Sequence, residues 1–298
     1  MIIDVHTHIT YHRFPEFVQK LGRKEFTAEI LLKRMDMEGI DKSVILPLSN
    51  PENADSYGVS NVFEALESAR KYPDRLIAFC NVDPRAMMNS HKADLSKVLK
   101  VYKEMGCKGV GEVCSNMYFD NELARNFFYH CGECEMPIVF HMSEKIGGVY
   151  GLVDDMHMPR LEKVLREFPK TIFIAHGPAF WSEIGEDVDE KERGHYPKCK
   201  KIEKPGSVPR LLEKYSNLYG DISAGSGHNA ISRDPDFGYK FLEEFNGKLL
   251  FGTDRFTSID EPMPDIIPFI KNALKEKKIS DQAYENITHK NTQRLIGG

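Results

Sequence analysis

The strongest constraint on the fold of this chain is a series of eight short apolar segments that alternate with segments of helical character. Each segment is rich in Val, Ile, Leu and Phe and is continuously apolar, as expected for parallel strands buried on both faces. In chain order they are residues 2–5, 43–48, 76–82, 109–113, 138–140, 172–175, 218–222 and 249–251. Eight strand–helix units favour a parallel sheet closed into a (β/α)8 barrel, the TIM barrel, over an open doubly wound sheet.

The segments between these runs carry helix signals. Residues 28–38 end at Gly39 and residues 94–105 end at Gly106, while proline follows closely after residues 59–71 and 158–168. Glycine just past a helix, or proline shortly after it, is a common stop signal. Residues 281–295 are predicted to form a last helix that packs on the barrel. The 298 residues therefore suit one barrel domain, 1–298.

Two segments depart from this regular plan. Residues 11–26 are aromatic and basic and predict an extended first βα loop. Residues 182–207 are highly charged and follow the sixth predicted strand. This insertion is either a solvated excursion or a lid or oligomer contact, because loops on that rim of a barrel surround the active site.

Composition limits the classes of partner. The net charge of −5 argues against binding to a nucleic-acid backbone. No apolar run approaches the roughly 20 residues that span a bilayer, and no signal-peptide pattern opens the chain. A core of this size needs no disulfides, so the six cysteines favour a reducing, cytoplasmic compartment, and the CxxC pair of Cys131 and Cys134 is interpreted as structural. A homodimer is the default expectation for the assembly.

Metal-ligand side chains recur at the ends of these predicted strands. They are His6, His8, Glu112, His141, His176 and Asp254. Because all strands of a parallel barrel point the same way, their carboxyl ends meet at one rim. Imidazole and carboxylate groups together suit a divalent transition metal. Any single member has a structural explanation, but the set predicts a metal site.

The first and fourth strands carry the strongest individual signals. His6 and His8 are two residues apart, so their side chains project from the same face, with Asp4 one step deeper. Glu112 lies inside an apolar strand between Gly111 and Val113. A buried glutamate is costly unless it is paired or bound to a metal.

With these residues the chain resembles the amidohydrolase superfamily, and within it the group of aminocarboxymuconate-semialdehyde decarboxylase-like enzymes. The resemblance covers nearly the whole chain. It rests on the motif Asp4-Val5-His6-Thr7-His8, on Glu112, His141 and His176-Gly177, on Gly252-Thr253-Asp254, and on Asn291-Thr292-Gln293-Arg294-Leu295. It implies that the first-strand histidines, the fifth-strand histidine and the eighth-strand aspartate contact the metal. It also implies that His176 binds a second metal or the substrate.

The fourth-strand position separates subgroups of this superfamily. Many two-metal members carry a carboxylated lysine there, whereas TatD-like nucleases and some phosphotriesterase-like proteins carry a glutamate. Glu112 resembles the glutamate type, which is able to bridge two metals, and Lys108 is placed too deep in the strand to serve. The sequence therefore leaves open whether the site holds one metal ion or two. Zinc is the first expectation, with manganese or another transition metal as the alternative.

The predicted reaction is hydrolysis of an amide, lactone or ester-like bond in a small molecule. The metal would activate a water molecule, Asp254 would act as general base, and His176 would orient the water, stabilise the oxyanion or bind a second metal. The alternative on the same scaffold is a non-oxidative decarboxylase of an unsaturated or aromatic carboxylic acid. Two further alternatives are less favoured. The acidic net charge argues against a TatD-like nuclease, and the intact set of metal ligands argues against a metal-free barrel that only binds a partner.

A small substrate, especially one that bears a carboxylate, needs contacts from the rim. Arg255, Arg13 and Arg85 lie in predicted βα loops, and guanidinium groups bind carboxylates in a bidentate manner. Trp181 is a candidate pocket wall, and His228 belongs to a Gly-rich stretch predicted to be a mobile loop. Each has a structural alternative. Further rim candidates are Tyr11, His12, Asn81, Asp83, Asp221 and Ser223.

Overall fold

The strands form where the sequence predicts them. The computed structural model describes residues 1–198, 201–256, 260, 262 and 264–297. Within these residues the strands are β1 (Ile3–Thr7), β2 (Lys42–Ile45), β3 (Leu76–Ala78), β4 (Val110–Val113), β5 (Ile138–Ser143), β6 (Leu152–Val153), β7 (Phe173–His176), β8 (Leu218–Asp221) and β9 (Leu249–Leu250). Eight of them coincide with the predicted apolar runs. The exception, β6, is two residues long and pairs only with β5.

These strands close into a barrel, which confirms the predicted fold class. All of the pairings are parallel and give two arcs, β1-β2-β3 and β4-β5-β7-β8-β9. Parallel bridges join the arcs at both seams, Cys80 with Val110 and Thr7 with Arg255. At the second seam the amide of Val5 also donates to the carbonyl of Phe251 at 3.0 Å. The carboxyl ends of the eight barrel strands therefore share one rim.

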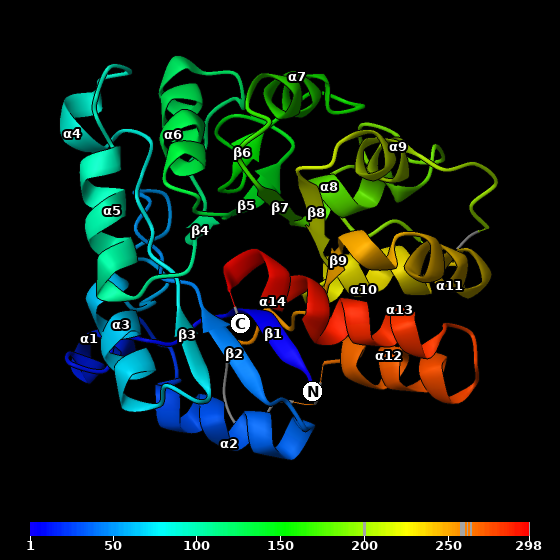
Figure 1. Cartoon of the computed structure of the whole chain (residues 1–298), viewed down its shortest axis with the longest axis horizontal. Coiled ribbons are helices and arrows are strands. Elements are labelled where there is room, and N and C mark those ends of the chain that lie inside the picture. The colour runs from blue at the N-terminus through cyan, green and yellow to red at the C-terminus, as the bar shows by residue number, and fades with distance from the viewer. Residues whose placement is uncertain (199–200, 257–259, 261, 263, 298) are drawn as a thin grey trace.

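Helices surround the barrel (Figure 1). In chain order they are α1 (Pro15–Lys20), α2 (Ala28–Glu38), α3 (Val62–Lys71), α4 (Ala86–Asn89), α5 (Ser96–Met105), α6 (Glu122–Glu133), α7 (Pro159–Glu167), α8 (Pro178–Trp181), η1 (Ser182–Ile184), α9 (Ser207–Lys214), α10 (Ala224–Ser232), α11 (Pro235–Glu244), η2 (Asn246–Lys248), α12 (Ile266–Lys275), α13 (Asp281–Glu285), η3 (Asn286–Lys290) and α14 (Asn291–Ile296). Local sequence sets their ends. The side chain of Asn61 caps α3 by accepting from two backbone amides, and Gly39 ends α2 with φ of 72°. Among the described helices, none has the length and apolar character needed to cross a bilayer.

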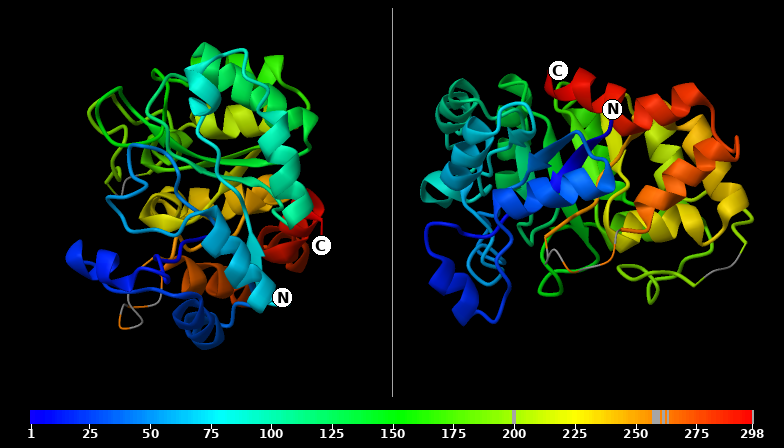
Figure 2. Two further views of the ribbon diagram at one scale, coloured as in Figure 1. Left: turned by 90° about the vertical axis from the view of Figure 1, so that its left-hand side faces the viewer. Right: turned by 90° about the horizontal axis from the view of Figure 1, so that it is seen from below.

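The core has two layers that follow the two faces of each strand. Phe173 and Ala175 of β7 belong to the large cluster between strands and helices, whereas Ile174 between them belongs to a smaller cluster inside the barrel. This inner cluster contains Val5, Val44, Leu46, Phe79, Val139, Ile174, Tyr219, Leu250 and Ile296. Ile296 comes from α14, so the last helix closes the amino-terminal end of the barrel. In the right-hand view of Figure 2, α14 and both termini lie at one end of the molecule and α1 at the opposite end.

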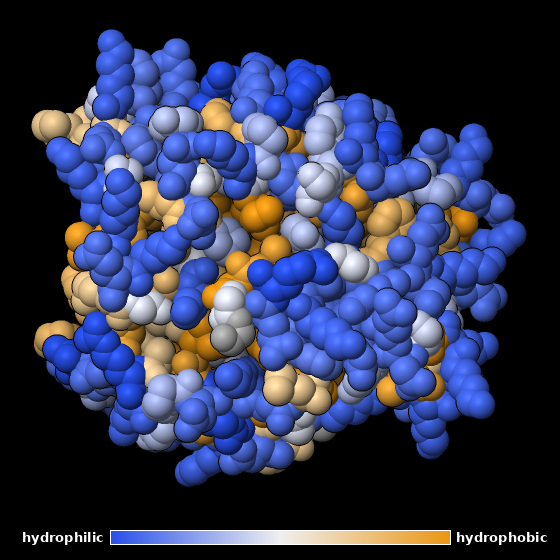
Figure 3. All heavy atoms as spheres, in the orientation of Figure 1, coloured by the Kyte–Doolittle hydropathy of each residue, from blue (hydrophilic) through white to orange (hydrophobic). Residues whose placement is uncertain are grey.

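The two predicted irregular segments have structure of their own. The long first βα loop contains α1, which stands away from the barrel (Figure 2). The predicted insertion begins in η1, and a bridge between Gly185 and Pro205 closes its base. Within it the buried guanidinium of Arg193 donates to Glu183 at 2.7 Å. Residues 199 and 200 of the insertion lie outside the described part of the chain. The face shown in Figure 3 is largely hydrophilic, with patches of hydrophobic residues visible between the hydrophilic ones.

The prediction of a mobile Gly-rich loop after Asp221 was wrong. Residues 224–232 form α10, which packs against α11 and α8. Gly227 of this helix, and Gly238 of the helix packed against it, are explained by close packing rather than mobility. A side chain at Gly227 would collide with the backbone of Ile222, and one at Gly238 of α11 would collide with the backbone of Ile231.

Candidate metal centre

The six predicted ligands meet at the carboxyl rim of the barrel. Strand periodicity explains three of the histidine and aspartate positions: His141, His176 and Asp221 each follow by two residues an inner-cluster residue of the same strand. Their side chains therefore continue the inner face up to the rim. His6 follows the inner-cluster residue Val5 by one position rather than two, at the place where the pairing register of β1 shifts between Asp4 and Thr7.

One group of donor atoms is centred on the first strand. The Nε2 atoms of His6 and His8 lie 3.1 Å apart. The Oδ1 atom of Asp254 lies 3.4 Å from each of them, and the Oε2 atom of Glu112 lies 3.7 Å from each. The side chain of Asp254 is 30% exposed, whereas those of His6, His8 and Glu112 are at most 6% exposed. Asp254 is therefore the member of this group that faces the opening of the site.

A second group of donor atoms lies on the other side of Glu112. Its Oε1 atom is 2.9 Å from Nδ1 of His141 and 3.9 Å from Nε2 of His176. The two imidazole rings of this group have centroids 5.3 Å apart. Glu112 thus presents one carboxylate oxygen to His6 and His8 and the other to His141 and His176. Such a carboxylate can be shared between two cations.

The outward nitrogens of three of these histidines are already occupied. Nδ1 of His6 lies 2.6 Å from a carboxylate oxygen of Asp221, and Nδ1 of His8 donates to the carbonyl of Leu46 at 2.7 Å. Nδ1 of His176 lies 3.0 Å from Oγ of Ser223. Donation from Nδ1 leaves the lone pair of each Nε2 atom free to bind a metal at the centre, which is the usual arrangement around metal-bound histidines. The residues present therefore fit a divalent cation.

The electrostatics of the site support the same conclusion. Burial opposes ionisation of Glu112, Asp221 and Asp254, but the neighbouring histidines hold the pKa of all three carboxyl groups below their ordinary values. Burial also lowers the pKa of His6, yet Asp254 and Asp221 raise it overall. Three ionised carboxylates in one buried space attract positive charge. By contrast, burial raises the pKa of the deeper Asp4 to about 7, against hydrogen bonds from Thr253 and His6.

Glycine permits the close packing of this rim. At Gly252 a Cβ atom would lie 2.7 Å from Oδ1 of Asp221 and 3.2 Å from the Cβ of His6. At Gly111, beside Glu112, it would lie 2.7 Å from the carbonyl oxygen of Val139. Any larger residue would displace the ligand-bearing strands.

Several predicted rim residues act behind the ligands. Asp221 and Ser223 contact His6 and His176 as described above. The side chain of Asn81 donates to the carbonyl of Glu112 at 2.6 Å. The indole nitrogen of the buried Trp181 donates to the carbonyl of Asp221 at 2.8 Å, so this residue supports a strand end rather than forming a pocket wall.

The arginines predicted to bind substrate are engaged elsewhere. Arg255 is buried, and its Nη2 atom lies 2.7 Å from a carboxylate oxygen of Glu38. Arg13 is 61% exposed and pairs with Glu67 at 2.7 Å. Arg85 pairs with both Asp83 and Glu52, each at 2.7 Å. Each arginine therefore has the structural role, an ion pair with a neighbouring carboxylate, that was the alternative to binding substrate.

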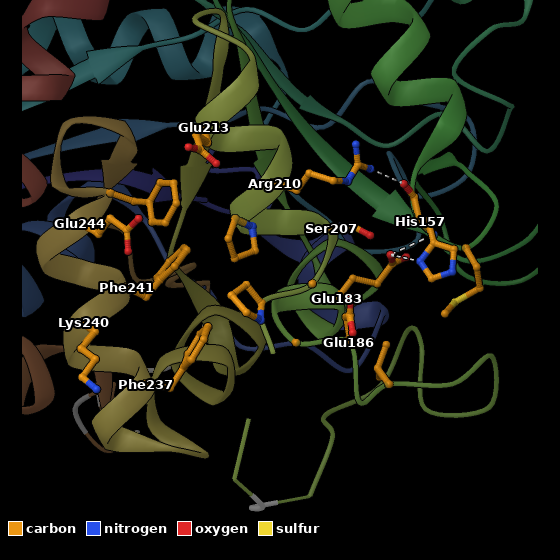
Figure 4. Close-up of a pocket in the computed structure, with 17 residues that line it drawn as sticks. His157, Glu183, Glu186, Ser207, Arg210, Glu213, Phe237, Lys240, Phe241 and Glu244 are labelled. Carbon is orange, nitrogen blue, oxygen red and sulfur yellow. Dashed lines mark hydrogen bonds and ion pairs between the residues drawn. The ribbon is translucent and has the colours of Figure 1, made fainter. Parts of the chain in front are cut away.

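His228 lies on α10, where its ring contacts Phe269 of α12. Burial lowers its pKa. A cavity of about 660 Å³ lies in the outer layer, between α9, α11 and η1, and none of the six predicted ligands lines it. Figure 4 shows Phe237 and Phe241 on one side of this cavity and Glu183 and Ser207 on the other. It is separate from the metal centre.

Sequence reasoning missed the aromatic residues around the opening of the site. The ring of Tyr150 lies 4.7 Å from that of His141, and the ring of Phe256 lies 5.9 Å from that of His8. Tyr57 contacts both aromatic residues, at 5.6 and 6.3 Å between ring centroids. All three lie in βα loops, where an aromatic residue has no periodicity to mark it. Their only signal was their position on the loops that follow β2, β5 and β9.

Fold and site together define a metal-binding barrel enzyme. The family model described as Amidohydrolase matches residues 3–298, and the chain belongs to this family. No curated protein sequence matches the chain.

Solved structures agree with the fold. An uncharacterized TIM-barrel protein from Bordetella bronchiseptica is 17% identical, with a TM-score of 0.64 over 99% of this chain and 97% of the other. A probable 2-pyrone-4,6-dicarboxylic acid hydrolase from Acinetobacter baumannii, with citric acid bound, is 13% identical, with a TM-score of 0.58 over 100% and 99% of the two chains. A 2,6-dihydroxybenzoate decarboxylase from Rhizobium is 16% identical, with a TM-score of 0.56 over 99% and 98%.

Proposed function

We propose that the protein is a two-metal hydrolase that cleaves an amide, lactone or ester-like bond in a small carboxylate-bearing molecule. The observation that carries this proposal is the position of Glu112, whose Oε2 atom faces His6 and His8 and whose Oε1 atom faces His141 and His176. His6, His8 and Asp254 would hold one ion with Glu112. His141 and His176 would hold the other.

Imidazole and carboxylate donors in these groups suit zinc first, and manganese second. A divalent metal held there supplies Lewis acidity, which lowers the pKa of water and polarises a scissile carbonyl.

The five described cysteines are free, and all are buried, which supports a reducing cellular compartment for the enzyme.

Asp254 is the proposed general base. It is the most exposed carboxylate of the set, and its pKa is held low by the histidines in spite of burial, so it is ionised at neutral pH. An ionised carboxylate at the opening accepts a proton from the attacking water and passes it to the leaving group. An ionised carboxylate is a poor proton donor, whereas decarboxylation requires a group that protonates carbon. This difference favours hydrolysis.

A decarboxylase of a planar carboxylic acid is the second candidate. The observation in its favour is the aromatic rim of Tyr57, Tyr150 and Phe256, which suits an unsaturated or aromatic body. Both hydrolases and decarboxylases occur among the similar structures.

A substrate screen separates the two reactions. Zinc-loaded protein is incubated with lactones and amides of small carboxylic acids, and in parallel with aromatic and unsaturated acids, while acid release and carbon dioxide are both measured. We expect hydrolysis without carbon dioxide, and loss of at least about 100-fold in kcat for Asp254→Asn. Carbon dioxide release from the acids, or full activity of Asp254→Asn, would contradict the proposal.

A further inference from the structure

One positively charged side chain at the opening has no partner among the described residues. Arg23 follows α1 in the first βα loop and is half-buried. Its guanidinium forms no ion pair or side-chain hydrogen bond within the described part of the chain, in contrast to Arg13, Arg85 and Arg255. An arginine left without a carboxylate in such a position is available to a ligand.

Aromatic rings hold this guanidinium in place. Its carbon lies 4.5 Å from the centroid of the Tyr57 ring and 5.8 Å from that of Phe256. Stacking on a ring uses the flat face of the guanidinium and leaves its N–H edges free to donate. A stacked arginine is also preorganised, so less side-chain entropy is lost when it binds an anion.

The same rings connect Arg23 to the metal centre. Phe256 contacts Arg23 on one side and the ring of His8 on the other. Tyr57 contacts Arg23 and also Tyr150, whose ring lies against His141. One ring, that of Phe256, therefore lies between Arg23 and His8, and two rings, those of Tyr57 and Tyr150, lie between Arg23 and His141. The space between is bordered by aromatic side chains, which favours a planar organic body.

Charge completes the description of the ligand. The donor groups include the carboxyl groups of Glu112 and Asp254, so an anionic end of a substrate is held there only through bound cations. Arg23 supplies positive charge at the far end.

We propose that Arg23 binds a carboxylate of the substrate that is remote from the reacting bond, so that the enzyme selects planar organic acids with a second polar group at the metal centre. This inference rests on the proposed function for the position of the reacting bond. The three candidates from the sequence, Arg255, Arg13 and Arg85, are instead engaged in ion pairs.

The test compares two ligands that differ only in the remote group. Isophthalate and 3-carbamoylbenzoate each keep one carboxylate for the metal centre, but the second carries a neutral amide where the first carries its other carboxylate. Binding to zinc-loaded protein is measured by calorimetry for wild type, Arg23→Met and Arg23→Lys. The matched control is Lys20→Met, which removes one charge from the exposed surface of α1 in the same loop.

We expect Arg23→Met to weaken isophthalate binding about 10- to 100-fold, the usual range for a charge-assisted bond to a carboxylate. Binding of 3-carbamoylbenzoate should weaken less than about 3-fold, and Lys20→Met should change neither ligand by more than about 2-fold. Arg23→Lys should restore part of the loss, because it keeps the charge but not the planar fork.

The inference is overturned if Arg23→Met weakens both ligands equally, which would show loss of rim structure alone, or weakens neither. Absence of isophthalate binding to wild type would also overturn it. Failure of the proposed function has a different signature. Protein that discriminates the two ligands through Arg23 but hydrolyses no lactone or amide keeps this inference and loses the hydrolase assignment.

Discussion

At the scale of single residues, the candidate site depends as much on the atoms behind the ligands as on the ligands themselves. Asp221 contacts Nδ1 of His6 at 2.6 Å, and Ser223 contacts Nδ1 of His176 at 3.0 Å. These contacts decide which nitrogen of each imidazole faces the centre. The main-chain carbonyl of Leu46 does the same for His8.

Asp221→Asn tests this dependence. The amide keeps the size of the side chain but loses the charge that favours donation from Nδ1 of His6, so we expect zinc affinity to fall about 10- to 100-fold. The measurement is competition with a chromophoric chelator, with circular dichroism to show that the fold is intact. The matched control is Asp120→Asn, which removes an acidic group paired with Arg160 on the outer helices. Equal affinity in wild type and Asp221→Asn would show that this contact does not tune the metal.

Sequence reasoning was most successful for residues that end a strand. His141 and His176 continue an inner-face periodicity of two, which is visible in the sequence as an apolar run with a polar end. Asp221 has the same placement and was named only as a further rim candidate. Arg23 and Tyr150 belong to loops, where contacts depend on the path of the backbone. No sequence pattern predicts that path. For this reason Arg13 and Arg255 were expected to contact substrate, whereas in the structure both pair with glutamates.

At the scale of elements, the strands and helices follow from local sequence, while the attachments between helices do not. Glu162 of α7 is an example: it lies 2.7 Å from both Arg210 and Lys214 of α9. Burial raises the pKa of Glu162, but these two cations lower it to about 2. The residue joins two helices that no sequence periodicity places side by side.

Glu162→Gln measures the value of this attachment and its pH dependence. A carboxyl group whose folded pKa is depressed stabilises the protein above its unfolded pKa and loses that effect as pH falls towards the folded pKa. Both cations are about half exposed, so we expect a loss of only about 1 kcal/mol in the free energy of unfolding at pH 7. In urea titrations the difference should shrink between about pH 4.5 and about pH 2. A difference that stays constant over this range would contradict the ion-pair explanation, and Glu133→Gln, an exposed pair with Lys170, serves as control.

At the scale of the whole molecule, closure of the barrel brings the functional groups together. The six ligands are spread over residues 6–254, yet their donor atoms lie within a few ångströms because eight parallel strands end at one rim. The eight alternating apolar runs favoured closure into a barrel over an open doubly wound sheet, and the structure confirms the barrel. The two-residue strand β6 and the helix α10 were not predictable, because the first is too short to have a pattern and the second depends on glycines that allow close packing.

The central claim is that Glu112 is shared by two metal ions, and anomalous diffraction from zinc-loaded crystals tests it most directly. We expect two peaks roughly 3.5–4 Å apart, one beside His6 and His8 and one beside His141 and His176, each within bonding distance of a different oxygen of Glu112. A single peak, or peaks that do not contact Glu112, would contradict the claim.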